Sequence, residues 1–104
     1  MAIFDLTGKT AVITGGGSGI GKSISQLFAQ QGAQVYILEL NAEAGEQTIQ
    51  EITTAGGKAT LRTCNVSQQS EVMQVFDSIE QEAGPINILI NNFSFLLITI
   101  KIIN

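Results

Sequence analysis

The sequence has 104 residues, of which 44% are hydrophobic and 13% are charged, with a single proline. This composition predicts one globular domain and excludes a largely disordered chain, because disordered chains are poorer in apolar residues and richer in charge. The net charge of −4, with five Lys and Arg and no basic cluster, argues against a nucleic-acid partner, which would be bound through cations.

The start of the chain and its single cysteine predict where the protein works. The first ten residues, MAIFDLTGKT, contain no basic segment followed by an apolar run, so they do not read as a secretory signal. Cys64 is the only cysteine and cannot form an internal disulfide, which agrees with a reducing compartment. We therefore expect a cytoplasmic protein in which Cys64 is a small buried apolar residue.

The first third of the chain predicts a strand, a helix and a second strand. Residues 9–14 form a short β-branched run that ends at a cluster of glycines, and residues 22–30 carry apolar side chains at helical spacing. Gly32 is expected to end this helix in the left-handed conformation that glycine favours. The apolar run over residues 34–40 then predicts a buried second strand.

The same alternation continues through the rest of the chain. Asn41 is expected to cap a second helix, and residues 59–64 predict a third strand. Ser67 is expected to open a third helix, which is followed by a fourth strand at residues 86–90. Strands separated by single helices indicate an α/β protein with a parallel sheet and right-handed crossovers.

A glycine-rich segment, TGGGSGIGKS, spans Thr14–Ser23 at the junction between the first strand and the first helix. Glycines let the backbone turn tightly and approach a ligand, while free N–H groups and the helix dipole favour a phosphate. The segment therefore predicts a nucleotide ligand, although a glycine-rich turn without a ligand is an alternative. One matching pattern is the phosphate loop of ATP and GTP hydrolases, in which Lys22 would reach the outer phosphates and Ser23 would hold magnesium.

The acidic residues separate a phosphate loop from a dinucleotide site. A phosphate-loop hydrolase needs a carboxylate at the end of another strand, whereas the later strands end in Cys64 and in Asn91–Asn92. Glu39 follows Gly21 by 18 positions and ends the second strand, about where a dinucleotide fold places the acid that binds the adenosine ribose. A carboxylate there repels a 2′-phosphate, so we expect NAD(H) to be preferred over NADP(H). The alternative roles are a solvated strand end for Glu39 and a solvated helix residue for Lys22.

The glycine pattern T-G-x-x-x-G-x-G resembles the fingerprint of the short-chain dehydrogenase/reductase family, and the resemblance covers about residues 3–92. It implies a truncated Rossmann-type parallel sheet with strand order 3-2-1-4 and helices on both faces. The chain is then a fragment of an enzyme for NAD(P)(H)-dependent oxidoreduction of an alcohol or ketone. The residues that it assigns to cofactor binding are Thr14, Gly15, Ser18, Gly19, Ile20, Gly21, Glu39, Asn65, Val66 and Asn91.

Two further segments carry this resemblance. Cys64–Val66 looks like the Asp-Val pair of the family, with Asn65 in place of the aspartate that contacts the adenine ring. Leu89–Asn92 looks like the start of the N-N-A-G segment, which stabilises the central sheet and lies along the cofactor. The alternative is that Asn65 and Asn91 only form hydrogen bonds with the backbone at strand ends.

The sequence departs from the family pattern after Asn92. Phe93 and Ser94 stand where Ala and Gly are expected, and a phenylalanine ring would crowd a place where backbone and cofactor come close. The catalytic Ser and Tyr-x-x-x-Lys of the family have no counterpart, since the only tyrosine, Tyr36, is followed four places later by Leu40 and is expected to be packed. We predict no catalytic residue and no metal site, and a chain that binds dinucleotide at best. A non-catalytic interaction fragment is the alternative.

The last twelve residues, 93–104, form an apolar tail that is distinct from the cofactor-binding part at residues 1–92. The tail could be an extra strand, a collapsed apolar cap or a non-native ending caused by a frameshift, a splice variant or sequence read past a boundary, and we favour the last of these three possibilities. It is too short to span a membrane, which takes about 20 apolar residues. We also expect the fourth strand to be an unprotected edge. The sequence predicts neither the substrate nor the oligomeric state.

Overall fold

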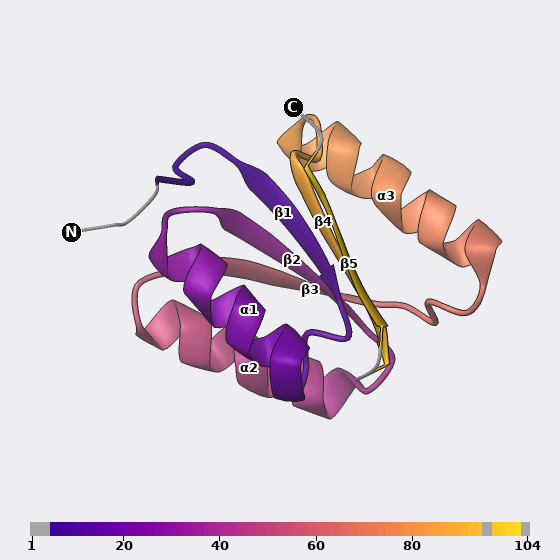
Figure 1. The fold of residues 1–104 in the computed structure, drawn as a ribbon, viewed down its shortest axis with the longest axis horizontal. Coiled ribbons are helices and arrows are strands. Elements are labelled where there is room, and N and C mark those ends of the chain that lie inside the picture. The colour runs from indigo at the N-terminus through magenta and orange to yellow at the C-terminus, as the bar shows by residue number, and fades with distance from the viewer. Residues whose placement is uncertain (1–4, 95–96, 103–104) are drawn as a thin grey trace.

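The computed structural model describes residues 5–94 and 97–102, with side chains as far as Asn92 (Figure 1). Strands and helices alternate as the sequence predicts, and a fifth strand follows the fourth. The elements are β1 (Thr10–Thr14), α1 (Gly19–Gln30), β2 (Gln34–Glu39), α2 (Ala42–Thr54), β3 (Lys58–Thr63), α3 (Gln69–Ala83), β4 (Ile88–Ser94) and β5 (Leu97–Ile102).

The five strands form one sheet with the order β3-β2-β1-β4-β5. β1 lies in the middle of the parallel part, where Ala11 is opposite Val35 of β2 and Ile88 of β4. β2 pairs in turn with β3 in parallel. The predicted Rossmann-type order 3-2-1-4 is therefore confirmed.

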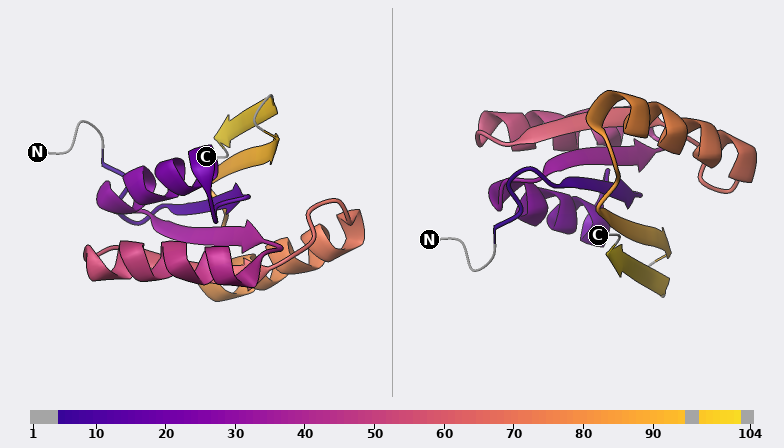
Figure 2. Two further views of the ribbon diagram at one scale, coloured as in Figure 1. Left: turned by 90° about the horizontal axis from the view of Figure 1, so that it is seen from below. Right: turned by 90° about the horizontal axis from the view of Figure 1, so that it is seen from above.

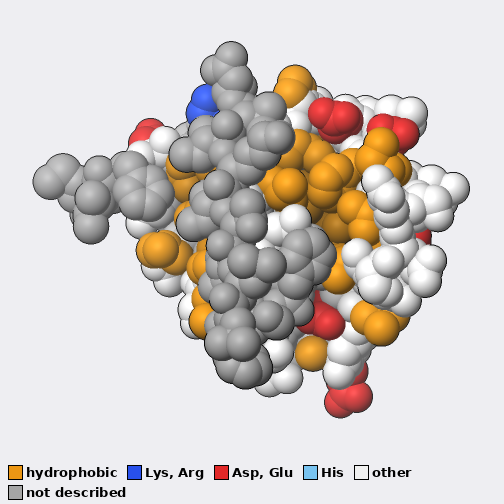
Figure 3. Space-filling model, turned by 45° about the vertical axis from the view of Figure 1, so that its right-hand side comes forward, with side chains coloured by type: hydrophobic (Ala, Val, Ile, Leu, Met, Phe, Trp, Pro, Cys, Tyr) orange, Lys and Arg blue, Asp and Glu red, His pale blue; other side chains and the backbone are white. Residues whose placement is uncertain are grey.

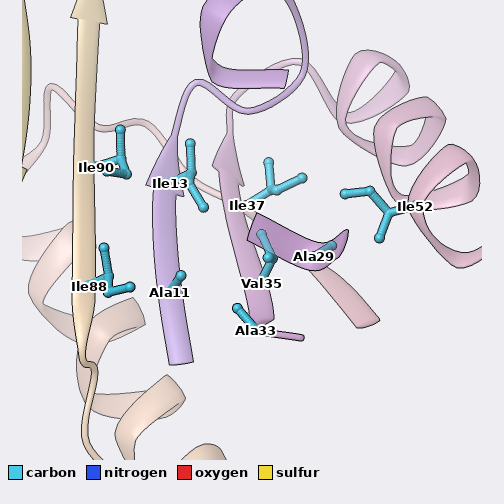
Figure 4. Close-up of a cluster of buried hydrophobic side chains, with 9 residues drawn as sticks. All are labelled: Ala11, Ile13, Ala29, Ala33, Val35, Ile37, Ile52, Ile88 and Ile90. Carbon is cyan, nitrogen blue, oxygen red and sulfur yellow. The ribbon is translucent and has the colours of Figure 1, made fainter. Parts of the chain in front are cut away.

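The helices cover both faces of the sheet, with α1 and α2 on one face and α3 on the other (Figures 1 and 2). Because successive strand residues point to opposite faces, Ala11 and Ile13 pack toward α1 and α2 while Val12 packs toward α3. The larger cluster is drawn in Figure 4 and consists of Ala11, Ile13, Ala29, Ala33, Val35, Ile37, Ile52, Ile88 and Ile90. The smaller cluster on the α3 side consists of Val12, Tyr36, Leu38, Cys64, Ile79 and Ile86, which confirms the buried position of Cys64.

The ends of the helices test three predictions. Asn41 caps α2 as expected, because its Oδ1 accepts a hydrogen bond from the Ala44 N–H at 3.1 Å. Gly32 follows α1 with a φ of 100°, which confirms its left-handed conformation. The prediction that Ser67 opens the third helix is wrong, since Gln68 is the N-cap of α3. The Ser67 hydroxyl instead donates to Asn65 Oδ1 at 2.7 Å in the preceding turn, so it is not available to the helix.

The apolar tail contains the strand that was one of three expected alternatives. β5 pairs with β4 in antiparallel register from Ile88 opposite Ile102 to Ser94 opposite Leu97, with an irregularity between Asn92 and Ser94 (Figure 2). The expectation of an unprotected β4 edge is therefore wrong, because β5 pairs with that edge. The predicted effect of the Phe93 ring falls outside the described side chains. The hypothesis of a non-native ending concerns the origin of the tail, and this pairing does not test it.

No helix in the described part of the chain is both long and apolar enough to cross a membrane.

Candidate functional site

The candidate site lies at the carboxyl end of β1, where the chain turns into α1. The connection from β1 leads to β2 on one side, whereas the connection from β3 leads to β4 on the other side of β1, so the strand order reverses at this point. Ligands of open α/β sheets bind at such switch points, outside the carboxyl ends of the strands. The Gly15 N–H donates to the Leu38 carbonyl oxygen of β2 at 2.8 Å, which fixes the start of the loop against its neighbour.

Each glycine of the fingerprint has a physical reason to be glycine. Gly15 and Gly19 have φ angles of 67° and 56°, in the left-handed region where an L side chain is strained. Gly21 lies in the first turn of α1, and a Cβ there would be 2.2 Å from the carbonyl oxygen of Gly15. The loop and the helix therefore approach each other more closely than any larger residue would allow.

The first turn of α1 contains backbone N–H groups that the helix itself leaves without a partner. Ser18 is the N-cap residue, and its side chain forms no capping hydrogen bond. The Lys22 N–H donates to the Ser18 carbonyl oxygen at 3.2 Å, so the N–H groups of Gly19, Ile20 and Gly21 have no partner within the helix. The first turn contains no acidic residue. These groups and the positive end of the helix dipole suit a pyrophosphate.

Glu39 lies at the end of β2, with its carboxylate against the glycine loop. Its Oε1 accepts a hydrogen bond from the Gly17 N–H at 2.9 Å, and its Oε2 accepts one from the Asn41 N–H at 3.1 Å. The side chain is half-buried and bound to two backbone groups. The structure thus brings the predicted acid and the predicted loop together. Contact between Glu39 and a ribose stays a prediction.

Thr14 connects β1 to β4 beside the loop. Its hydroxyl donates to Asn91 Oδ1 at 3.3 Å and accepts from the Asn92 N–H at 2.8 Å. Because Thr14 is 2% exposed, these bonds satisfy a buried hydroxyl and hold the ends of the two central strands together. Asn91, a predicted site residue, thus binds a side chain of the neighbouring strand.

Asn92 belongs to the same site, although the sequence did not place it among the cofactor-binding residues. Its Nδ2 lies 3.3 Å from where a Cβ on Gly15 would be and 2.9 Å from where one on Gly21 would be. The Asn92 side chain therefore packs against both ends of the glycine loop. Its position as the second asparagine of Leu89–Asn92 was the only sequence signal for this role.

The turn after β3 contributes Asn65 and Val66, and Val66 packs on the α3 side of the sheet. Asn65 Oδ1 accepts hydrogen bonds from the backbone N–H and the hydroxyl of Ser67 at 3.1 and 2.7 Å, so the oxygen is used within its own turn. Val66 lines an apolar cavity of about 290 Å³ between α3 and β4, on a face where apolar side chains gather (Figure 3). The other residues that line this cavity are Thr14, Ser67, Gln69, Val72, Phe76, Leu89 and Asn91.

Lys22 and Tyr36 both have partners within the fold. The Lys22 ammonium forms an ion pair with Glu51 Oε2 of α2 at 2.7 Å. Tyr36 is fully buried, as expected of a packed residue, and its hydroxyl donates to Glu82 Oε2 at 2.5 Å. Burial, together with the hydrogen bond and charge of Glu82, raises the pKa of Tyr36 to about 12. This phenol is therefore a poor proton donor near neutral pH.

Comparison with known proteins identifies relatives of the whole alternating unit. A family model described as short chain dehydrogenase matches residues 9–99. Short chain dehydrogenase/reductase dpchG of Colletotrichum higginsianum is 38% identical over 87 residues, which are 84% of this chain and 32% of the relative. The 7alpha-hydroxysteroid dehydrogenase of Escherichia coli is 39% identical over 84% of this chain and 34% of the relative.

A solved structure gives the same result at the level of the fold. A 7alpha-hydroxysteroid dehydrogenase in complex with NADH and 7-oxo glycochenodeoxycholic acid superposes with a TM-score of 0.78 at 38% identity. The match covers 82% of this chain and 33% of the solved one. The chain therefore spans about a third of the length of the curated relatives that it matches. None of these matches supports the phosphate-loop alternative.

Proposed function

The chain belongs to the short chain dehydrogenase family, and on that premise we propose that it is the dinucleotide-binding part of an oxidoreductase. The cofactor proposed is NAD(H), and the reaction is the interconversion of an alcohol and a ketone. One observation carries the proposal: the Glu39 carboxylate, the glycine loop and the open first turn of α1 meet at the switch point of the sheet.

The pyrophosphate is assigned to the first turn of α1. The N–H groups of Gly19, Ile20 and Gly21 supply donors, and the exposed Ser18 adds a hydroxyl that forms no capping bond within the protein. In the described part of the chain, no atom outside this turn lies within 4 Å of where a Cβ on Gly19 would be, so a ligand can approach the backbone at this residue. These features together favour a diphosphate group.

The adenosine ribose is assigned to Glu39. An ionised carboxylate offers about four acceptor positions, and two are used by the Gly17 and Asn41 N–H groups. The remaining positions can accept hydrogen bonds from the 2′- and 3′-hydroxyls. A 2′-phosphate would instead meet a like charge, which supports a preference for NAD(H) over NADP(H).

The adenine ring is assigned to the turn after β3 by the family resemblance. Because the Asn65 oxygen is used by Ser67, its amide N–H groups are the part left to bind a ring nitrogen. Cys64 and Glu39 are joined by a backbone hydrogen bond of 3.2 Å, so this turn lies next to the ribose position.

Hydride transfer is the chemistry that the nicotinamide supplies when it is bound. The reaction also requires a proton donor beside the substrate carbonyl. The single tyrosine of this chain cannot serve, because Tyr36 is buried against Glu82 and its pKa is raised to about 12. We therefore propose that the chain by itself binds the dinucleotide without turnover.

A binding titration and a turnover assay on the 104-residue chain test this proposal. The sequence contains no tryptophan, so enhancement of NADH fluorescence can be followed against a low protein background. We expect saturable NADH binding and no cofactor-dependent turnover with a panel of alcohols and ketones. A folded chain that does not bind NADH, or turnover that a substitution in this chain abolishes, would contradict the proposal.

A further inference from the structure

We propose that the backbone N–H groups of Gly17 and Asn41 hold the Glu39 carboxylate in place, and that Gly17 thereby determines the choice between NAD and NADP. The inference rests on the proposed function and adds a specificity residue to it. Gly17 is not one of the fingerprint positions of T-G-x-x-x-G-x-G.

The carboxylate is held from both sides. Oε1 accepts from the Gly17 N–H at 2.9 Å, and Oε2 accepts from the Asn41 N–H at 3.1 Å. Asn41 is fixed in turn, because it caps α2 through the Ala44 N–H. Hydrogen bonds to an ionised group are about twice as strong as those between neutral groups. The orientation of Glu39 is therefore set before any ligand arrives.

A fixed carboxylate discriminates more strongly than a mobile one. A free glutamate side chain could rotate away from a 2′-phosphate at little cost, since its rotamers lie close in energy. Here the same rotation would break the hydrogen bonds to Gly17 and Asn41 and leave two backbone donors unpaired. Movement of the Glu39 side chain therefore does not relieve the repulsion between its carboxylate and the 2′-phosphate of NADP.

Gly17 leaves just enough room for this arrangement. A Cβ on Gly17 would lie 2.6 Å from Glu39 Oε1 and 3.0 Å from the Ala44 Cβ. The carboxylate is the movable tip of a side chain, so it would yield first, while Ala44 in α2 blocks the other direction. Gly17→Ala therefore displaces the acid without removing its charge. A glycine at this position is explained by Glu39, whereas Gly15 and Gly19 are explained by their φ angles.

The test compares NAD and NADP affinities across a double-mutant cycle in the 104-residue chain. We expect the unmutated chain to bind NAD more tightly than NADP. Gly17→Ala should reduce the dissociation constant for NADP divided by that for NAD by about tenfold, the cost of one charge-assisted hydrogen bond. In the Glu39→Ala background, Gly17→Ala should change the ratio by less than about twofold, because no carboxylate remains to be displaced. Gly19→Ala is the matched control: it strains the same loop and should weaken both cofactors without changing the ratio.

A second measurement needs no cofactor. The Gly17 amide should exchange slowly with solvent deuterium in the unmutated chain and at least about tenfold faster in Glu39→Ala, as expected for loss of its acceptor. An unchanged affinity ratio in Gly17→Ala, or equal Gly17 exchange rates, would overturn the inference. It is also possible to separate the two proposals. If neither cofactor binds the unmutated chain but slow exchange of the Gly17 amide still depends on Glu39, the proposed function is wrong, while the hydrogen bond that holds the carboxylate is supported.

Discussion

Gly21→Ala should change the stability of the fold through two opposing effects, helix propensity and packing. Gly21 lies in α1, where alanine is favoured over glycine by about 0.5–1 kcal/mol. The new Cβ would, however, lie 2.2 Å from the Gly15 carbonyl oxygen and 2.9 Å from Asn92 Nδ2. Ordinary contact begins at 3.4 Å, so the helix and the loop must separate by more than an ångström. Overpacking of this kind costs about 1–3 kcal/mol, so packing outweighs propensity.

The expected outcome is a net loss of stability of about 1–2 kcal/mol, and thus a Tm lower by roughly 5–15 °C in a domain of this size. The loss cannot be relieved by a rotamer change, because the nearest atom belongs to the backbone of Gly15. The displaced carbonyl also opens the loop, so NADH affinity should fall together with stability.

Gly45→Ala provides a matched control in α2. Gly45 is also a buried helical glycine, but its Cβ would meet the terminal methyl groups of Leu61, at 2.6 and 3.1 Å. A half-buried leucine can change its rotamer, so we expect a stability change within about 1 kcal/mol of zero. Thermal unfolding of both variants, followed by far-ultraviolet circular dichroism, makes the comparison. A Gly21→Ala protein that melts at or above Gly45→Ala would refute the reasoning.

Two other regions make separate predictions. Burial and Glu82 raise the pKa of Tyr36 from near 10 to about 12, so the stability contributed by its neutral form is complete below pH 10 and is lost as pH rises toward about 12. Urea unfolding should show that loss in the unmutated chain but not in Tyr36→Phe, and parallel pH profiles would contradict it. We expect copies of the chain to associate through the apolar cavity beside α3, so Val72→Gln, at a residue that lines it, should reduce the concentration dependence of the sedimentation velocity. Met73→Gln, at a residue that is 56% exposed and outside this cavity, should have less effect, and an equal reduction by both would count against the cavity.

The order of the parallel strands could be predicted because it follows from local signals. β1 and β2 are short, mostly apolar runs, and each crossover is one helix with a recognisable end, such as the Asn41 cap or Gly32. The first residue of α1 was harder to predict from the sequence. The predicted helix starts at Lys22, with its first apolar residue at Ile24, whereas the helix begins at Gly19, because glycines carry no apolar signal. The close packing of Gly21 against Gly15, a tertiary contact, sets that first turn.

The pairings within the site could not be predicted from spacing alone. The position of Glu39 indicated an acid near the loop, but its bonds to the Gly17 and Asn41 N–H groups depend on how β2 lies beside β1. The contact of Asn92 with Gly15 and Gly21 likewise joins residues more than seventy positions apart. Ser67 shows the opposite case, in which a local competitor, the Asn65 side chain, overrode a capping signal.

The direction of β5 follows from the length of its connection. Only two residues separate Ser94 at the end of β4 from Leu97 at the start of β5. A parallel neighbour needs a crossover of about a dozen residues or more, so two residues permit only an antiparallel return. The segment contains no Gly or Pro to mark a turn, and it therefore looked like one continuous apolar run. β5 takes up the open edge of β4 but adds no crossover helix. The contacts that carry the functional proposal thus lie within residues 14–92, between the end of β1 and the second asparagine of β4.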